Sequence, residues 1–228
     1  MNSDTLYLLI IVMLFVSMIA QRLVSSKFNK YSKVQVSSRL TGKDAASRLL
    51  RSAGLSDVKI ELVSGKLSDH YDPSSKTLRL SEAVYHSDSI AAVSVASHEA
   101  GHAIQHAESY QPLMLRNSSV FMVNFGSKLS WPIFLLGLVL GISPLVHVGI
   151  ALYVFIVLFT LITLPVEFNA SHRAISLMTA NGIMAESEKS MANSVLSAAA
   201  MTYVVSAITA ILQLMRLIAI AKGNRRRN

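Results

Sequence analysis

Residues 97–102, Ser-His-Glu-Ala-Gly-His, are the stretch of the chain whose residue types and spacing most clearly indicate chemistry. Two histidines four residues apart lie on one face of a helix, one turn from each other, where both can bind a single metal ion. Glu99 follows the first histidine, so its carboxylate is placed to take a proton from a metal-bound water. The pattern is typical of zinc hydrolases. It predicts His98 and His102 as zinc ligands and Glu99 as the general base.

The residues around this motif predict the helix that it requires. Side-chain oxygens in the segment 87–89 can cap a helix, and residues 90–107 contain no proline and are mostly apolar or small. His106 lies on the same face, but a straight helix places it about 12 Å from His98, too far for both to bind one ion. We therefore assign His106 a structural role or one in supporting the ligands.

The composition indicates a membrane protein that carries one small polar domain. The chain has 228 residues, of which 52% are hydrophobic and only 15% are charged. Its net charge of +8 comes from basic residues that cluster beside apolar segments, without an aromatic-basic recognition motif. Membrane topology and anionic lipid explain this charge. The expected partner is therefore a lipid bilayer, and no nucleic acid is expected to bind.

Apolar segments divide the chain into five predicted parts. The expected fold class is a mainly α membrane protein, with about four hydrophobic helices and a small α+β zincin-like catalytic domain of gluzincin type. An uncleaved anchor is favoured over a signal peptide at the N-terminus, because no positive charge precedes the apolar run and no small-residue cleavage site follows it. The parts are an N-terminal transmembrane anchor (1–25), the catalytic domain with the motif helix (26–115), a transmembrane helical hairpin (116–166), a third-ligand helix with a polar linker (167–194), and a C-terminal hydrophobic helix with a basic tail (195–228).

Alternation of apolar and polar residues predicts the elements of the small domain. We expect strands at 34–36, 58–63 and 76–80, a helix at 41–53 with Thr41 as its cap, and a turn at 69–73. The strand leading towards the motif helix could pair as an edge with an extended peptide and hold the scissile bond over the zinc. A purely structural strand is the open alternative.

Glu167 is the predicted third zinc ligand. A catalytic zinc has three protein ligands, and the chain contains no cysteine, so histidine and carboxylate must supply them. Two membrane spans separate Glu167 from His102, and an even number of crossings returns it to the same face. Glu108 lies at the far end of the motif helix, and the other nearby acids, Glu186 and Glu188, lie in a polar linker with no evident anchor. An interfacial carboxylate that caps a helix after Pro165 is a compatible alternative.

The motif, together with Glu167-Phe168-Asn169-Ala170-Ser171 beyond a two-span hairpin, resembles the YugP-type neutral zinc metallopeptidases of bacterial membranes. The stretch from Asp69-His70-Tyr71-Asp72-Pro73 to Gln105 is also similar to that family. More distantly, the layout is similar to HtpX-type and CAAX-processing membrane proteases, which also place membrane helices between the motif and the ligand glutamate. In those proteases an aspartate often follows the glutamate by four positions, and here Ser171 stands in that place.

The function expected from the sequence is that of a membrane-embedded endopeptidase with one zinc ion per chain. Its substrate would be a peptide or protein, which could itself be a membrane protein. Six residues are candidates to stabilise the oxyanion or to support the zinc ligands: His70, Tyr71, His106, Ser171, His172 and Arg173. The alternative from another class is a non-catalytic zinc-binding scaffold or chaperone-like assembly factor in the membrane.

Basic residues predict the orientation in the cell membrane. Five of them, from Arg22 to Arg39, follow the first span, and the positive-inside rule then places the catalytic domain on the cytoplasmic face. A fourth full crossing would put the basic tail at 225–227 outside, against the same rule. Either the last apolar segment does not cross, or the whole topology is inverted.

Overall fold

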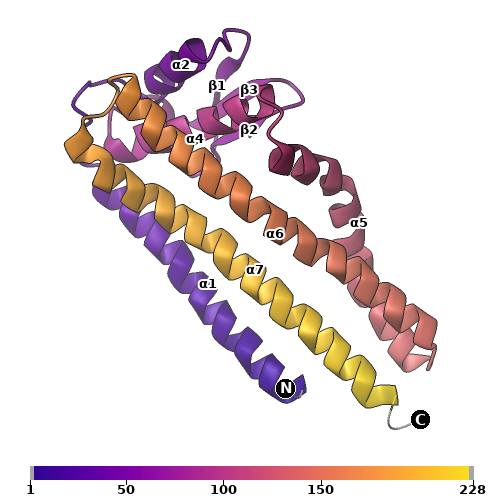
Figure 1. The fold of residues 1–228 in the computed structure, drawn as a ribbon. Helices are drawn as coiled ribbons and strands as arrows, with labels where there is room; N and C mark the ends of the chain where they lie inside the picture. The colour runs from indigo at the N-terminus through magenta and orange to yellow at the C-terminus, as the bar shows by residue number, and fades with distance from the viewer. Residues whose placement is uncertain (1–2, 226–228) are drawn as a thin grey trace. The chain divides into compact units, whose positions relative to one another are not determined.

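Four long helices contain most of the residues that the computed structural model describes, which are residues 3–225. These helices are α1 (Ser3–Tyr31), α5 (Gln111–Val139), α6 (Ser143–Ala180) and α7 (Lys189–Arg225), and each is long and apolar enough to cross a membrane (Figure 1). Arg226 and Arg227 of the predicted basic tail lie outside the described residues. The expectation of a mainly helical chain with four hydrophobic helices is confirmed.

The remaining elements are short and lie between α1 and α5, except for one 3₁₀ turn before α7. They are α2 (Gly42–Ser52), β1 (Lys59–Val63), β2 (His70–Asp72), β3 (Thr77–Ser81), α3 (Glu82–Tyr85), α4 (Ile90–Ala107) and η1 (Glu186–Glu188). The chain divides into two compact units, and α1, α5, α6 and α7 contribute residues to both. The first unit comprises residues 1–20, 114–165 and 202–228, and the second comprises residues 21–113 and 166–201.

The second unit contains the sheet and the motif helix α4. The strand order is β1-β3-β2, with β1 parallel and β2 antiparallel to β3, so β2 lies at one edge. Figure 1 shows the three strands grouped with α2 and α4, and α2 packs against α4. Leu49 of α2, Leu78 and Leu80 of β3, Ile90 of α4 and Met178 of α6 are fully buried in one core. This core fixes the position of α4, which carries the candidate site.

Local sequence explains several of these boundaries. Thr41 caps α2 by accepting a hydrogen bond from the backbone N–H of Asp44, and Gly54 follows the helix with a positive φ of 73°. The predicted strands at 58–63 and 76–80 are confirmed as β1 and β3. The strand expected at 34–36 is wrong, since only an isolated bridge joins Gln35 to Ser89. The turn expected at 69–73 is also wrong in part, because residues 70–72 form the edge strand β2.

The first unit has apolar side chains on its surface, as membrane-spanning helices do. Phe121 and Val139 of α5 are 77% and 82% exposed, and Leu14 and Ile19 of α1 are also exposed. Exposed apolar surface on this scale is unfavourable in water but suits contact with lipid. In the region of the predicted hairpin, α5 is followed by α6 after a short connection at residues 140–142. However, α6 does not end near residue 166, where the predicted hairpin ends, but continues to Ala180.

Helices α5 and α6 approach each other closely at a glycine. A Cβ atom added to Gly149 of α6 would lie 2.7 Å from the Cβ atom of Phe134 on α5, so no larger residue fits there without a shift. The hydroxyl of Ser130 donates a hydrogen bond to the carbonyl of Gly149 at 2.8 Å. Small residues and interhelical hydrogen bonds of this kind hold helices together where lipid removes the hydrophobic driving force.

Candidate metal centre

The motif helix α4 begins at a defined cap and is mostly buried. The hydroxyl of Ser89 accepts a hydrogen bond from the backbone N–H of Ala92 at 3.2 Å, so the predicted cap region supplies the N-cap. One turn apart on this helix, the rings of His98 and His102 lie with centroids 4.7 Å apart and nearly perpendicular planes. Their position therefore follows from the four-residue spacing and from the burial of the helix.

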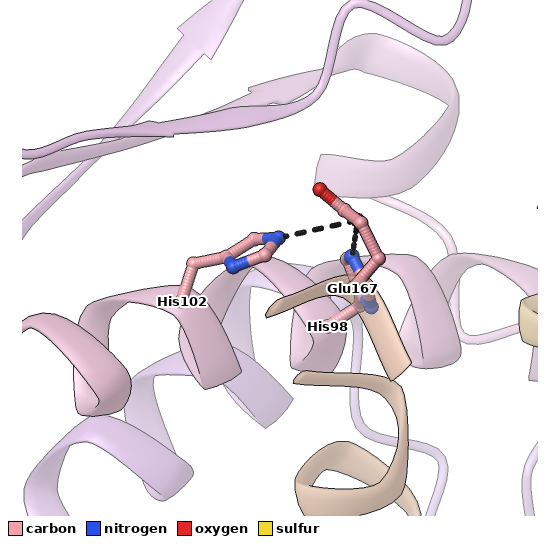
Figure 2. Close-up of side chains that lie close together, drawn as sticks. All are labelled: His98, His102 and Glu167. Carbon is pink, nitrogen blue, oxygen red and sulfur yellow. Dashed lines mark ion pairs between the residues drawn. The ribbon is translucent and has the colours of Figure 1, made fainter. Parts of the chain in front are cut away.

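Glu167 extends from α6 to both imidazole rings, as Figure 2 shows. Its Oε2 atom lies 3.3 Å from Nε2 of His98 and 3.6 Å from Nε2 of His102. One ligand atom from each of the three residues lies within 4.8 Å of the others. Within residues 3–225 this is the one group of three such side chains that could hold a metal ion.

A close contact between α4 and α6 brings Glu167 near the histidines. Gly101 stands between the two histidines in the motif of α4. A Cβ atom added to Gly101 would lie 2.9 Å from the carbonyl oxygen of Ala170 on α6. Ala170 is fully buried, and Glu167 is only 2% exposed. The absence of a side chain at position 101 thus allows the backbone of α6 to approach the motif helix.

The other ring nitrogen of each histidine has a separate partner. Nδ1 of His98 lies 3.1 Å from the hydroxyl of Ser171, and Nδ1 of His102 lies 3.0 Å from Oε1 of Gln105. Both Nε2 atoms are then directed to the same place as the Glu167 carboxylate. Two imidazoles held in this way and one carboxylate are a common donor set for zinc, so the residues present fit that ion.

Glu99 lies beside this group, and the edge strand holds it. The backbone N–H of Tyr71 in β2 donates a hydrogen bond to Oε2 of Glu99 at 3.1 Å. Burial raises the pKa of the Glu99 carboxyl, although the nearby rings of His102 and His98 act in the opposite direction. A carboxyl group with a raised pKa accepts a proton more readily at neutral pH, which is what a general base requires.

The surrounding carboxylates favour positive charge at the histidines. Burial lowers the pKa of the His102 imidazole, but its contact with Glu167 and the charge of Glu99 outweigh this effect, and the pKa is raised. The same negative potential that favours a proton on His102 also favours a bound cation. The electrostatics of the site are therefore suited to a metal ion.

The structure separates the six proposed helper residues into groups. Tyr71 contacts Glu99 through its backbone, and its hydroxyl lies 3.0 Å from Nδ1 of His106. Burial raises the pKa of this hydroxyl. Ser171 contacts His98, as described above. His70 and His172 are exposed, and Nδ1 of His70 lies 2.8 Å from the carbonyl of Ser68.

Arg173 contacts a neighbouring amide and a carboxylate. Its Nε atom donates to Oδ1 of Asn169 at 2.8 Å, and its Nη1 atom pairs with Oε2 of Glu108 at 2.6 Å. The amide of Gln105 donates to the same Oδ1 atom of Asn169 and to the carbonyl of Val166. The sequence reasoning missed Gln105 and Asn169 as site residues. In the sequence, Gln105 is marked only as a polar amide three residues after His102, and Asn169 only as a polar amide two residues after Glu167.

The three acidic residues near the motif that are not expected to be ligands, Glu108, Glu186 and Glu188, have other partners. Glu108 pairs with Arg173, and Glu186 is exposed and pairs with Lys189 at 2.9 Å. Glu188 corrects the expectation of an unanchored linker. Its carboxylate accepts hydrogen bonds from the backbone N–H and the hydroxyl of Ser37 and from the backbone N–H of Ala185. It therefore joins the chain before α2 to the loop between α6 and α7.

Comparisons with known proteins point to the same chemistry. A family model described as "Putative neutral zinc metallopeptidase" matches residues 6–222. A curated relative from Bacillus subtilis (strain 168), "Putative membrane protease YugP", is 49% identical over 209 residues. This match covers 92% of the present chain and 93% of the relative. No solved structure gives a significant match.

Proposed function

We propose that this chain, which belongs to the family of neutral zinc metallopeptidases, is a membrane-embedded zinc endopeptidase of the gluzincin type. The observation that carries the proposal is the convergence of the Nε2 atoms of His98 and His102 on Oε2 of Glu167. A purely structural zinc site closes its fourth position and does not need a carboxylate such as Glu99 beside it. We therefore favour hydrolysis over a scaffold role.

In this proposal His98, His102 and Glu167 hold one zinc ion per chain. When bound there, zinc supplies a Lewis acid that lowers the pKa of a coordinated water and polarises a carbonyl group. Because the Glu167 carboxylate and the two imidazoles come from two helices, α4 and the segment of α6 after Pro165 must stay in fixed contact. The packing of Gly101 against Ala170 supports that requirement.

Glu99 is proposed to move the proton. Its carboxylate takes a proton from the attacking water and then gives it to the amine of the leaving peptide, so that it ends the cycle in its original state. The N–H of Tyr71 keeps one oxygen of Glu99 in place during both transfers. This explains why the edge strand and the motif helix need to be in contact.

The edge strand β2 is also the proposed binding place for the substrate backbone. In an antiparallel pair, the N–H and C=O groups of one residue point to the same side of its strand. Since the N–H of Tyr71 points to Glu99 and away from β3, the carbonyl of Tyr71 also faces away from β3 and can accept a hydrogen bond from a peptide N–H. An extended peptide can pair there, so peptide or protein is the proposed substrate class.

We further propose that the protein is a multi-pass protein of the cell membrane with the site on the cytoplasmic face. The proposal rests on the basic residues after the first span and on four helices long and apolar enough to cross a membrane. Its partners are then the lipid bilayer and a peptide or membrane-protein substrate.

The decisive experiment measures metal content and casein hydrolysis with the full chain purified in detergent. We expect one zinc per chain by elemental analysis, and loss of the metal in His98→Ala and His102→Ala. Glu99→Gln should keep the zinc, while its turnover falls by about two to four powers of ten because the base is lost. Glu82→Gln is the matched control, since Glu82 is an exposed residue of α3 outside the site.

Three results would overturn this proposal. Full zinc retention in both histidine variants would remove the ligand assignment. Unchanged hydrolysis in Glu99→Gln would refute the general base and indicate a contaminating peptidase. Zinc binding by wild-type protein that never cleaves casein or a panel of unfolded membrane proteins would favour the scaffold function.

A further inference from the structure

A continuous chain of hydrogen bonds runs from His102 to a charged pair at the end of α4. Nδ1 of His102 contacts Oε1 of Gln105 at 3.0 Å. The Nε2 atom of Gln105 donates to the carbonyl of Val166 at 2.9 Å and to Oδ1 of Asn169 at 2.8 Å. Arg173 then donates to the same Oδ1 atom and pairs with Glu108. The chain therefore connects both helices of the candidate metal centre.

The direction of each hydrogen bond in this chain is determined by its fixed ends. A guanidinium group has donors only, so the atom of Asn169 that faces Arg173 must be its oxygen. The carbonyl of Val166 can only accept. The atom of Gln105 that faces both of these oxygens must then be its nitrogen, and the atom that faces His102 must be its oxygen. No alternative placement of the two amides satisfies all of these contacts.

It follows that Nδ1 of His102 carries the proton. An oxygen of Gln105 that accepts a hydrogen bond requires a donor, and the imidazole supplies one only when Nδ1 is protonated. In a neutral ring the lone pair then lies on Nε2, the atom that faces Glu167 at 3.6 Å. This is the tautomer that can bind a metal ion through Nε2.

We propose that Gln105 is a positioning residue that fixes the tautomer and ring orientation of His102 and ties the two metal-binding helices together. Gln105 is fully buried, both of its amide hydrogens are used, and its oxygen accepts the His102 proton. Through Val166 it also holds the backbone directly before Glu167. The inference rests on the proposed function for the role of Nε2 as a ligand, but the hydrogen-bond chain itself does not depend on the metal.

His98 provides an internal comparison. Its Nδ1 atom faces the hydroxyl of Ser171, which can donate or accept. This contact therefore leaves the tautomer of His98 open, whereas the Gln105 chain decides it for His102. We therefore expect the tautomer of His102 to depend strongly on Gln105, and the tautomer of His98 to depend little on Ser171.

The test compares Gln105→Leu with wild type in the full-length protein. Leucine is similar in size but removes the acceptor and both donors. In metal-free wild-type protein with ¹⁵N-labelled histidine, we expect His102 to be protonated at Nδ1 at a pH where the ring is neutral. In Gln105→Leu a signal for the Nε2-protonated form should appear. The affinity for zinc should fall by about 10- to 100-fold, and the visible spectrum of the cobalt-loaded protein should change.

Two further variants separate this role from a general loss of structure. Ser94→Ala changes a buried residue of the same helix whose hydroxyl bonds to the carbonyl of Ile90, outside the chain. It should leave the tautomer and the zinc affinity unchanged. Asn169→Ala removes the next hydrogen-bond partner in the chain, at a half-buried position. This variant should weaken zinc binding several-fold, and it tests the proposal even if Gln105→Leu does not fold.

The proposal is overturned if wild-type His102 is protonated at Nε2, or if Gln105→Leu binds zinc as tightly as wild type. An unchanged affinity in Asn169→Ala would also contradict it. The proposed function is tested separately by His102→Ala, because zinc retention in that variant would exclude His102 as a ligand. The tautomer measured in metal-free protein would still stand in that case.

Discussion

The backbone N–H of Tyr71 donates a hydrogen bond to Oε2 of Glu99 at 3.1 Å, across a gap of 28 residues in the sequence. The edge strand β2 therefore sets the position of the proposed general base. A side chain on a helix surface has several rotamers available, and a fixed donor selects one of them. The distance between Glu99 and the attacking water would then depend on the length of the Glu99 side chain.

Glu99→Asp tests this dependence. The shorter side chain withdraws the carboxylate by one methylene group, either from the Tyr71 N–H or from the water. We expect zinc content to stay at one per chain and kcat for casein to fall about 100-fold, since a misplacement of about 1 Å can cost that much. Glu82→Asp, at an exposed position of α3, should have normal kinetics. A kcat within a factor of three of wild type would show that the exact reach of Glu99 is unimportant.

Glu167→Gln tests the third ligand. The variant keeps the size of the side chain but replaces one carboxylate oxygen with an amide nitrogen and removes the charge. We expect zinc affinity, measured by competition with a chelating dye, to fall by more than the roughly 100-fold typical for a residue that only supports a ligand. Glu186→Gln is the control, because Glu186 is exposed and pairs with Lys189. If zinc binding survived Glu167→Gln and collapsed in His70→Ala or His172→Ala, the assignment of the third ligand would be wrong.

Glu188→Gln is predicted to act on stability without acting on the metal. The buried carboxylate of Glu188 accepts three hydrogen bonds, from the N–H and hydroxyl of Ser37 and the N–H of Ala185. An amide leaves at least one of these donors without an acceptor, which costs about 1–3 kcal/mol of unfolding free energy. Thermal unfolding should show a lowered Tm for Glu188→Gln and an unchanged Tm for Glu186→Gln. Equal Tm values for the two variants would contradict the prediction.

Asp72 predicts a dependence of stability on pH. Hydrogen bonds from Ser74, Ser75 and Arg79 hold the pKa of Asp72 well below its usual range. The folded-state pKa is depressed, so the stabilisation is present above the unfolded pKa of about 4 and is lost as the pH falls below it. In metal-free protein, the Tm of wild type should therefore fall more steeply between pH 5 and pH 3 than that of Asp72→Asn. Parallel curves would exclude this role.

The absence of cysteine allows a direct test of orientation. Ser56 is exposed in the second unit, so Ser56→Cys gives a single thiol on its surface. If the catalytic domain is cytoplasmic, a membrane-impermeant thiol reagent should label this variant only after the cells are lysed. Labelling in intact cells would place the domain outside, and the basic residues at 225–227 would then form the cytoplasmic tail.

The parts of the site that follow from local spacing could be predicted from the sequence. His98, Glu99 and His102 are related by helix geometry alone, and the parity of apolar segments suggested that Glu167 lies on their side of the membrane. Gln105 and Asn169 could not be found in this way. Their contacts depend on the distance and rotation between α4 and α6, which side-chain packing determines and no short-range pattern encodes.

Two errors in the predicted fold have similar causes. Residues 69–73 contain two aspartates and a proline, which favour a turn, but pairing with β3 draws residues 70–72 into a strand. The predicted hairpin ends at residue 166, with a separate helix after it. Instead α6 continues through Pro165, which is tolerated in apolar helices where neighbouring groups compensate the missing N–H.

Gly101 shows that a position written as unspecified in the zinc motif has a defined requirement in this fold. The pattern His-Glu-x-x-His accepts any residue there, yet a Cβ atom at 101 would lie 2.9 Å from the carbonyl oxygen of Ala170. A database search by spacing alone would thus accept chains with a bulky residue that this helix contact excludes. Requiring glycine before the second histidine, and a small residue three positions after the glutamate, would select chains that can close a His-His-Glu site between two packed helices.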